Sequence, residues 1–159
     1  MSTGFIIAMV GAALATILGG IGSILGVSNC GKAAAGVTSE QPELFGKLLV
    51  LKILTGTQGL YGFLVTILVF MNLGVLGGDA AAGMSISMEQ GWAYFIACLP
   101  IMINGLLSAI FQGKVAAAGI AMTAKQPDAS GKGITMAILV ETYAILSLIV
   151  SILLVLGLK

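Results

Sequence analysis

Long apolar stretches separated by short polar ones dominate this sequence. A helix needs about 20 mainly apolar residues to cross a bilayer core of roughly 30 Å. Four stretches meet this requirement, at residues 1–31, 53–78, 90–113 and 133–158. The pattern predicts an all-α membrane protein with four transmembrane helices.

Only the fourth stretch contains a charged residue, Glu141. A charge inside the bilayer costs at least about 2.5–3.5 kcal/mol on insertion scales, so such a residue usually lines a pathway or pairs with a partner. Because no Lys lies at comparable depth, we expect Glu141 to be protonated or matched to a bound cation. The alternative is a neutral Glu that only fastens helices together by hydrogen bonding.

The composition supports the membrane assignment and excludes several kinds of function. The chain is 58% hydrophobic and 8% charged, and its mean hydropathy is +1.13, far outside the range of soluble domains. A net charge of +1 without any Arg provides no basic surface for nucleic acid. Two distant cysteines and no His leave no basis for zinc sites, thiol redox pairs or histidine-based catalysis.

The lysines predict how the chain crosses the membrane. Six of the seven cluster around two connections: Lys32, Lys47, Lys52, Lys114, Lys125 and Lys132. The middle connection carries only Asp79 and Glu89, and Lys159 is the exception to the pattern. Cytoplasmic loops carry an excess of Lys and Arg. We therefore expect loops 32–47 and 114–132 to face the cytoplasm of a cell membrane and both termini to be extracellular.

Each lysine-bearing connection also contains a Gln-Pro pair, Gln41-Pro42 in one and Gln126-Pro127 in the other, followed by an acid. Pro and an acidic residue both suit the first turn of a helix. The pairs therefore predict the starts of the second and fourth helices. The connections themselves are either solvated turns or a docking surface.

The chain resembles itself when it is shifted by 83 residues. The shift aligns Gly22 with Gly105, the Ala-Ala-Ala-Gly run at 33–36 with that at 116–119, and Gln58 with Glu141. This internal repeat predicts two fused helical hairpins, residues 1–75 and 88–159, of which only the second carries the carboxylate.

Small residues recur at a spacing of about four on the first and third predicted helices: Gly11, Ala15, Gly19, Gly22, Gly26, Gly105, Ala109 and Gly113. In lipid, small residues allow helix backbones to approach closely. The pattern predicts tight packing, either within one four-helix bundle or between identical copies.

Polar groups near Glu141 indicate what the carboxylate binds. The second predicted helix carries four residues at the spacing i, i+3, i+4 and i+7, which places them on one face: Leu54, Thr57, Gln58 and Tyr61. Gln112 lies near the cytoplasmic end of the third stretch.

The number of oxygens in this group bears on the identity of the ion. One carboxylate, two amides, a hydroxyl and a released backbone carbonyl would supply the oxygens that a dehydrated Na⁺ needs. A proton needs only one or two hydrogen-bond partners. Each neutral side chain taken alone is also explained by ordinary interhelical hydrogen bonding, but together with the carboxylate they favour a cation site.

The same residues carry a resemblance to a known family. Gly-Thr-Gln-Gly-Leu-Tyr-Gly-Phe at 56–63, the repeated Ala-Ala-Ala-Gly, and Val-Glu-Thr-Tyr-Ala-Ile-Leu at 140–146 resemble the membrane-rotor proteolipids of V-type ATPases. The likeness covers nearly the whole chain and is greatest to the proteolipids, called subunit K or c, of bacterial sodium-translocating enzymes. It implies a non-catalytic subunit that forms a homo-oligomeric ring in lipid. A soluble ATP-hydrolysing sector turns the ring through a central-stalk subunit, and a stator membrane subunit exchanges ions with it.

The resemblance also implies the ion ligands. The family's Na⁺-binding residues carry over onto the carbonyl of Leu54 and the side chains of Thr57, Gln58, Gln112 and Glu141, with Tyr61 as the hydrogen-bond partner of the carboxylate. The sequence departs from the family at Thr55, where Pro is common and helps to release a backbone carbonyl.

Two other functions share some of these features. A proton-carrying V-type rotor has the same architecture and needs fewer oxygens at its site. A small multidrug antiporter also combines four short helices with one buried Glu, but it places that Glu in the first helix beside aromatic residues. The chain contains no P-loop, so ATP hydrolysis is expected to take place in another subunit.

Overall fold

The structure is a computed structural model and describes residues 1–78, 81 and 84–158. The long elements are α1 (Thr3–Glu40), α2 (Phe45–Leu54), α3 (Thr57–Asn72), α5 (Met88–Lys125) and α6 (Ser130–Gly157). Short 3₁₀ turns, η1 (Pro42–Leu44) and η2 (Pro127–Ala129), lead into α2 and α6. Asp79 and Lys159, which contributed to the predicted topology, lie outside the described residues.

Four helical segments are long and apolar enough to cross a membrane: Thr3–Glu40, Pro42–Asn72, Met88–Lys125 and Pro127–Leu156. The predicted all-α architecture with four membrane-spanning helices is confirmed. Pro42 and Pro127 open the turns that start the second and fourth segments, as the Gln-Pro pairs predicted.

The helices are longer than the charge-free stretches, and the predicted loops 32–47 and 114–132 are wrong in length. Lys32 lies within α1, Lys47 within α2 and Lys114 within α5, so the connections shrink to the Gln-Pro turns. Lysine carries its charge on a long apolar stem that lies along a helix while the head reaches water. A lysine therefore ends an apolar stretch without ending the helix.

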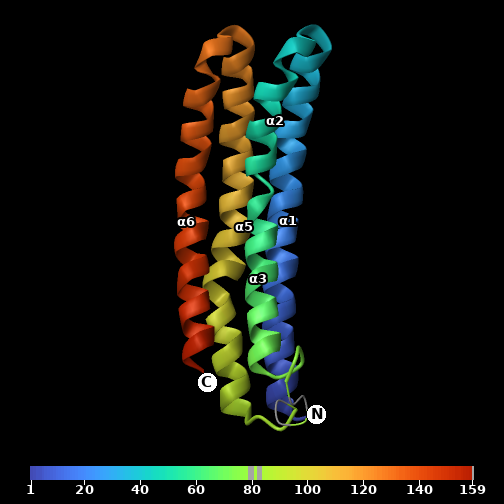
Figure 1. The fold of residues 1–159 in the computed structure, drawn as a ribbon, viewed down its shortest axis with the longest axis vertical. Helices are drawn as coiled ribbons and strands as arrows, with labels where there is room; N and C mark the ends of the chain where they lie inside the picture. The colour runs from blue at the N-terminus through green and yellow to red at the C-terminus, as the bar shows by residue number, and fades with distance from the viewer. Residues whose placement is uncertain (79–80, 82–83, 159) are drawn as a thin grey trace.

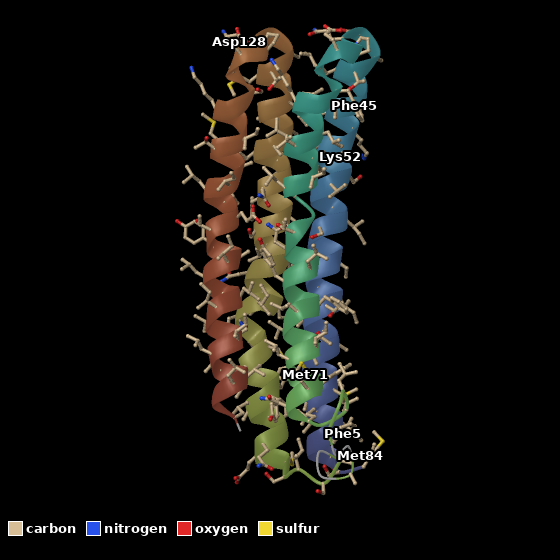
Figure 2. The ribbon with its side chains drawn as sticks, viewed as in Figure 1. Phe5, Phe45, Lys52, Met71, Met84 and Asp128 are labelled. Atoms are coloured by element: carbon tan, nitrogen blue, oxygen red, sulfur yellow. The ribbon has the colours of Figure 1, made fainter. Side chains whose placement is uncertain are left out.

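Figure 1 shows the helices running side by side along one axis, with the α1–α2 and α5–α6 turns at one end and both termini at the other. Lys52 and Asp128 lie toward the end with the turns, and Phe5 and Met71 toward the end with the termini (Figure 2). The first helices of the two halves, α1 and α5, therefore run in the same direction, and the segments that follow them, α2–α3 and α6, run back together.

Glycines bring α1 and α5 into close contact. A Cβ atom at Gly22 would lie 2.7 Å from the carbonyl oxygen of Leu106, and one at Gly113 would lie 2.5 Å from the Cα of Gly26. Both approaches are closer than any side chain allows. At these positions the small residues therefore serve packing within one chain.

The outer surface of α6 carries large apolar side chains that the chain itself does not cover. Leu139 is 61% exposed, Leu153 64% and Tyr143 67%. A continuous apolar face of this kind suits a lipid environment or another copy of the chain.

Candidate ion-binding site

Glu141 is buried between three helical segments, and neutral hydrogen-bond donors surround it. The residue lies on α6 and is 6% exposed. Its Oε1 accepts hydrogen bonds from Thr57 Oγ1 and from the Tyr61 hydroxyl, both at 2.6 Å. Its Oε2 accepts one from Gln112 Nε2 at 3.2 Å. Polar groups of α3 and α5 thus enclose a carboxylate carried by α6.

Two glutamines, Gln58 and Gln112, extend the hydrogen-bonded group around Glu141. Gln58 Nε2 donates to Gln112 Oε1 at 2.5 Å, and both side chains are fully buried. Gln58 Oε1 has no hydrogen-bond partner among the residues that the structure describes. A buried acceptor without a donor is costly. The site therefore contains an oxygen that only a further donor or a cation would satisfy.

The Leu54 carbonyl and Glu141 compete for the single proton of the Thr57 hydroxyl. Thr57 Oγ1 lies 3.1 Å from the Leu54 carbonyl oxygen and 2.6 Å from Glu141 Oε1. A hydroxyl has one proton, so Thr57 satisfies only one of these two oxygens at a time. When Thr57 donates to Glu141, which Tyr61 also contacts, the Leu54 carbonyl is left as an acceptor beside the carboxylate.

A helix break places this carbonyl at the depth of Glu141. The second membrane-spanning segment is divided at Thr55 and Gly56, where Figure 1 shows a thin stretch of ribbon between α2 and α3. The Gly56 N–H donates to the Ile53 carbonyl at 3.0 Å, a bond to the third preceding residue instead of the fourth. The break forms although Thr55 stands where the related family often has Pro.

Ser108 is a further residue next to the site, and we did not predict it. Its hydroxyl donates to the carbonyl of Val140 at 3.1 Å, one residue before the carboxylate. Ser108 also lies four residues before Gln112, on the same face of α5. That spacing was a signal that would have identified it.

The structure brings all six predicted site residues together: Leu54, Thr57, Gln58, Tyr61, Gln112 and Glu141. Gln112 turns its nitrogen, and not its oxygen, toward the carboxylate. The assignment of these residues as ion ligands stays a prediction.

Comparison with known proteins finds that the chain is similar to ATPase and ATP synthase subunits. The family model for the C subunit of ATP synthase matches the chain over two segments, residues 10–69 and 95–154. The V-type sodium ATPase subunit K of Enterococcus hirae is 50% identical over 154 residues, which cover 97% of this chain and 93% of that protein.

Of two more distant relatives, one has a name that gives no ion and the other is named for a proton ATPase. The A-type ATP synthase subunit K of Methanocaldococcus jannaschii is 39% identical over 152 residues, covering 96% of this chain and 63% of that protein. The 16 kDa proteolipid of the V-type proton ATPase of Nephrops norvegicus is 27% identical over 144 residues, covering 91% and 86%.

Proposed function

The chain belongs to the family of ATP synthase C subunits, and from that premise we propose that it is a rotor-ring proteolipid of a V-type ATPase that carries Na⁺ across the membrane. The 50% identity to a subunit K of a sodium ATPase supports this choice of ion. Because the chain belongs to this family, we no longer interpret the buried Glu as that of a multidrug antiporter. The chain is a multi-pass membrane protein without catalytic activity of its own.

The observation that carries the proposal is the unpaired Gln58 Oε1, on a side chain that Gln112 links to Glu141 by hydrogen bonds. Glu141 accepts hydrogen bonds from Thr57, Tyr61 and Gln112. These donors suit an ionised carboxylate, because a protonated carboxyl must also donate its own O–H. The Gln58 oxygen has no partner among the described residues. A bound Na⁺ draws on this oxygen, since a hard cation stripped of its water needs several oxygen ligands. The donors around Glu141 and the unpaired Gln58 oxygen together favour the metal ion over the proton.

In the proposed Na⁺ complex, the ligands are one carboxylate, two amides, one hydroxyl and one backbone carbonyl: Glu141, Gln58, Gln112, Thr57 and Leu54. The Gln112 amide presents its nitrogen to Glu141 in the structure, so its oxygen becomes a ligand only after the amide turns over and gives up its bond from Gln58 Nε2. The two ends of the amide have nearly the same shape, so the turn needs little space. Tyr61 holds the carboxylate in place from the side.

Ion loading would couple to rotation through the charge on Glu141. An empty carboxylate is anionic and is expensive to expose to lipid, so a copy leaves the stator only when its site is filled. Moving one charge against 100 mV takes about 2.3 kcal/mol. That free energy must come from ATP hydrolysis in the soluble sector.

The proposed assembly is a ring of identical copies in lipid, in which residues 1–75 and 88–159 act as two equivalent hairpins. The exposed apolar surface of α6, including Leu139 and Tyr143, would meet lipid and the stator membrane subunit. The end that carries the two short turns and most lysines would face the cytoplasm and the central stalk. Both termini would then be extracellular.

Carbodiimide modification of Glu141 in the purified oligomer tests the proposal. We expect Na⁺ in the millimolar range to slow labelling at neutral pH, because the ion holds the carboxylate occupied and unprotonated. Potassium at the same ionic strength should not protect. Mass spectrometry of the chain measures the extent of labelling.

A matched pair of variants assigns the protection to the site. Gln112→Ala should weaken Na⁺ protection several-fold, whereas Gln126→Ala, which alters an exposed Gln at a turn, should leave it unchanged. Labelling that depends on pH alone and ignores Na⁺ would identify a proton rotor and refute the sodium assignment.

A further inference from the structure

A hydroxyl from a different helix meets the break in the second segment. Ser23 lies on α1 and is 8% exposed. Its Oγ donates to the Gly56 carbonyl at 3.1 Å and accepts from the Gly59 N–H at 2.9 Å. The Gly59 N–H is one of the first four of α3, which have no partner within their own helix. Ser23 therefore caps α3 from outside.

Thr55 satisfies the other side of the break. It is fully buried, and its Oγ1 donates to the Lys52 carbonyl at 2.9 Å. In an unbroken helix that carbonyl would accept the Gly56 N–H, which here binds Ile53 instead. Cys30 Sγ of α1 lies 3.1 Å from Thr55 Oγ1 and places the hydroxyl against α1.

These two hydroxyls satisfy backbone groups that lipid cannot. Irregular backbone at membrane depth is tolerated only where protein groups or water replace the lost hydrogen bonds. Proline commonly forces such a break by lacking an N–H and clashing with the preceding turn. This chain has Thr in place of Pro at the break, and hydrogen bonds from side chains accompany the break in place of the proline ring.

We propose that Ser23 and Thr55 are positioning residues of the ion site, which hold the second segment open so that the Leu54 carbonyl stays available beside Glu141. The inference rests on the proposed function. Neither side chain is among the proposed ligands, so both act through the backbone. Without the hydroxyls, the segment gains by closing into a regular helix, in which the Leu54 carbonyl would accept the Gln58 N–H.

The consequence is a selective loss of Na⁺ affinity. Tyr61 lies one turn inside α3, beyond the break, and donates to Glu141, so the carboxylate keeps this partner in both variants. Ser23→Ala and Thr55→Val should each raise the Na⁺ concentration for half-protection of Glu141 by about three- to tenfold, the range expected for one net hydrogen bond. The rate of labelling at neutral pH without Na⁺ should match that of the wild type.

Three further variants distinguish positioning from general packing. Thr55→Pro should keep wild-type protection, because proline breaks the helix by itself. Thr55→Ser should do the same through its hydroxyl. Thr16→Val removes a different hydroxyl contact between α1 and α3, the one with Thr66 at 2.8 Å, and should also have no effect on Na⁺ protection.

Each result decides a separate question. Wild-type oligomer that Na⁺ does not protect would overturn the proposed function and this inference together. Protection of the wild type that is unchanged in Ser23→Ala and Thr55→Val would overturn the inference alone. An equal shift in Thr16→Val would also overturn it, by showing that any lost contact between these helices weakens the site.

Discussion

The second and fourth membrane-spanning segments begin from one repeated pattern but differ in continuity. Under the shift of 83 residues, Thr55 and Gly56 correspond to Ile138 and Leu139. The first pair separates α2 from α3, whereas α6 continues through the second pair as one helix from Ser130 to Gly157. A Thr hydroxyl competes for backbone carbonyls, and Gly weakens a helix. Ile and Leu do neither.

The difference explains how one repeated unit would supply the two kinds of ligand that we propose. The unbroken helix holds the charged group, Glu141, on a rigid support. The broken segment supplies most of the neutral groups proposed as ligands, which include a backbone carbonyl that a regular helix would keep for itself. A site with one charge and several neutral oxygens therefore needs two segments that have diverged.

The largest expected effect comes from removing the charge. Glu141→Gln should lower ATP-driven Na⁺ uptake into vesicles holding the intact ATPase by at least about 100-fold, because no neighbouring group replaces the carboxylate. Adding Gln58→Glu to this variant should not restore uptake, since the hydroxyls of Thr57 and Tyr61 point to the α6 position. Recovery of uptake in the double variant would show that the two segments are interchangeable.

The next largest effect is the loss of stability when Ala replaces one of two glycines that the repeat aligns, Gly22 and Gly105. A Cβ at Gly22 would lie 2.7 Å from the Leu106 carbonyl oxygen, whereas the nearest atom to one at Gly105 is Ile101 Cδ1 at 3.6 Å. Gly22→Ala should destabilise the protein by about 1–3 kcal/mol through overpacking. Gly105→Ala should be neutral or stabilising by up to about 1 kcal/mol, because Ala favours helix.

Thermal unfolding of the detergent-solubilised protein measures both glycine variants. Equal losses of stability at the two positions would mean that the α1–α5 contact is as tight at Gly105 as at Gly22, contrary to the structure. If neither alanine variant lost stability, the close approach of the two backbones would not explain why these positions are glycine.

Much of the fold and the candidate site follows from local rules that the sequence expresses directly. The four helices follow from apolar length, and the importance of Glu141 follows from the cost of a charge in lipid. The shared face of Thr57, Gln58 and Tyr61 follows from the helical period. These predictions need no knowledge of how the helices pack.

Features that depend on contacts between distant segments were not predicted. The hydroxyl that contacts the backbone at the break belongs to Ser23, which is far away in sequence. Pro100 lies inside α5, and the N–H of Ile101 donates to Ser151 of α6 at 3.2 Å. The orientation of the Gln112 amide likewise depends on its bond with Gln58. In each case the deciding partner belongs to another helix.

The smallest expected effect comes from removing a single polar contact away from the ion site, either one between α1 and α3 or one between α5 and α6. Thr16 Oγ1 lies 2.8 Å from Thr66 Oγ1 in the first hairpin, and Asn104 Nδ2 donates to Ser147 Oγ at 2.5 Å in the second. Both partners keep another bond when the contact is removed, because Thr66 also donates to the Ala12 carbonyl and Ser147 to that of Tyr143. No buried group is then left unpaired.

Thr16→Val should therefore cost only about 0.6 kcal/mol, the average for such contacts in membranes. Asn104→Leu should cost less, because Asn104 is exposed and an apolar side chain suits a surface that faces lipid. Thermal unfolding of the two variants in one detergent checks the order. A larger loss for Asn104→Leu would show that a neighbouring copy covers this amide with a hydrogen-bond partner, so that the second hairpin also forms a polar contact between copies.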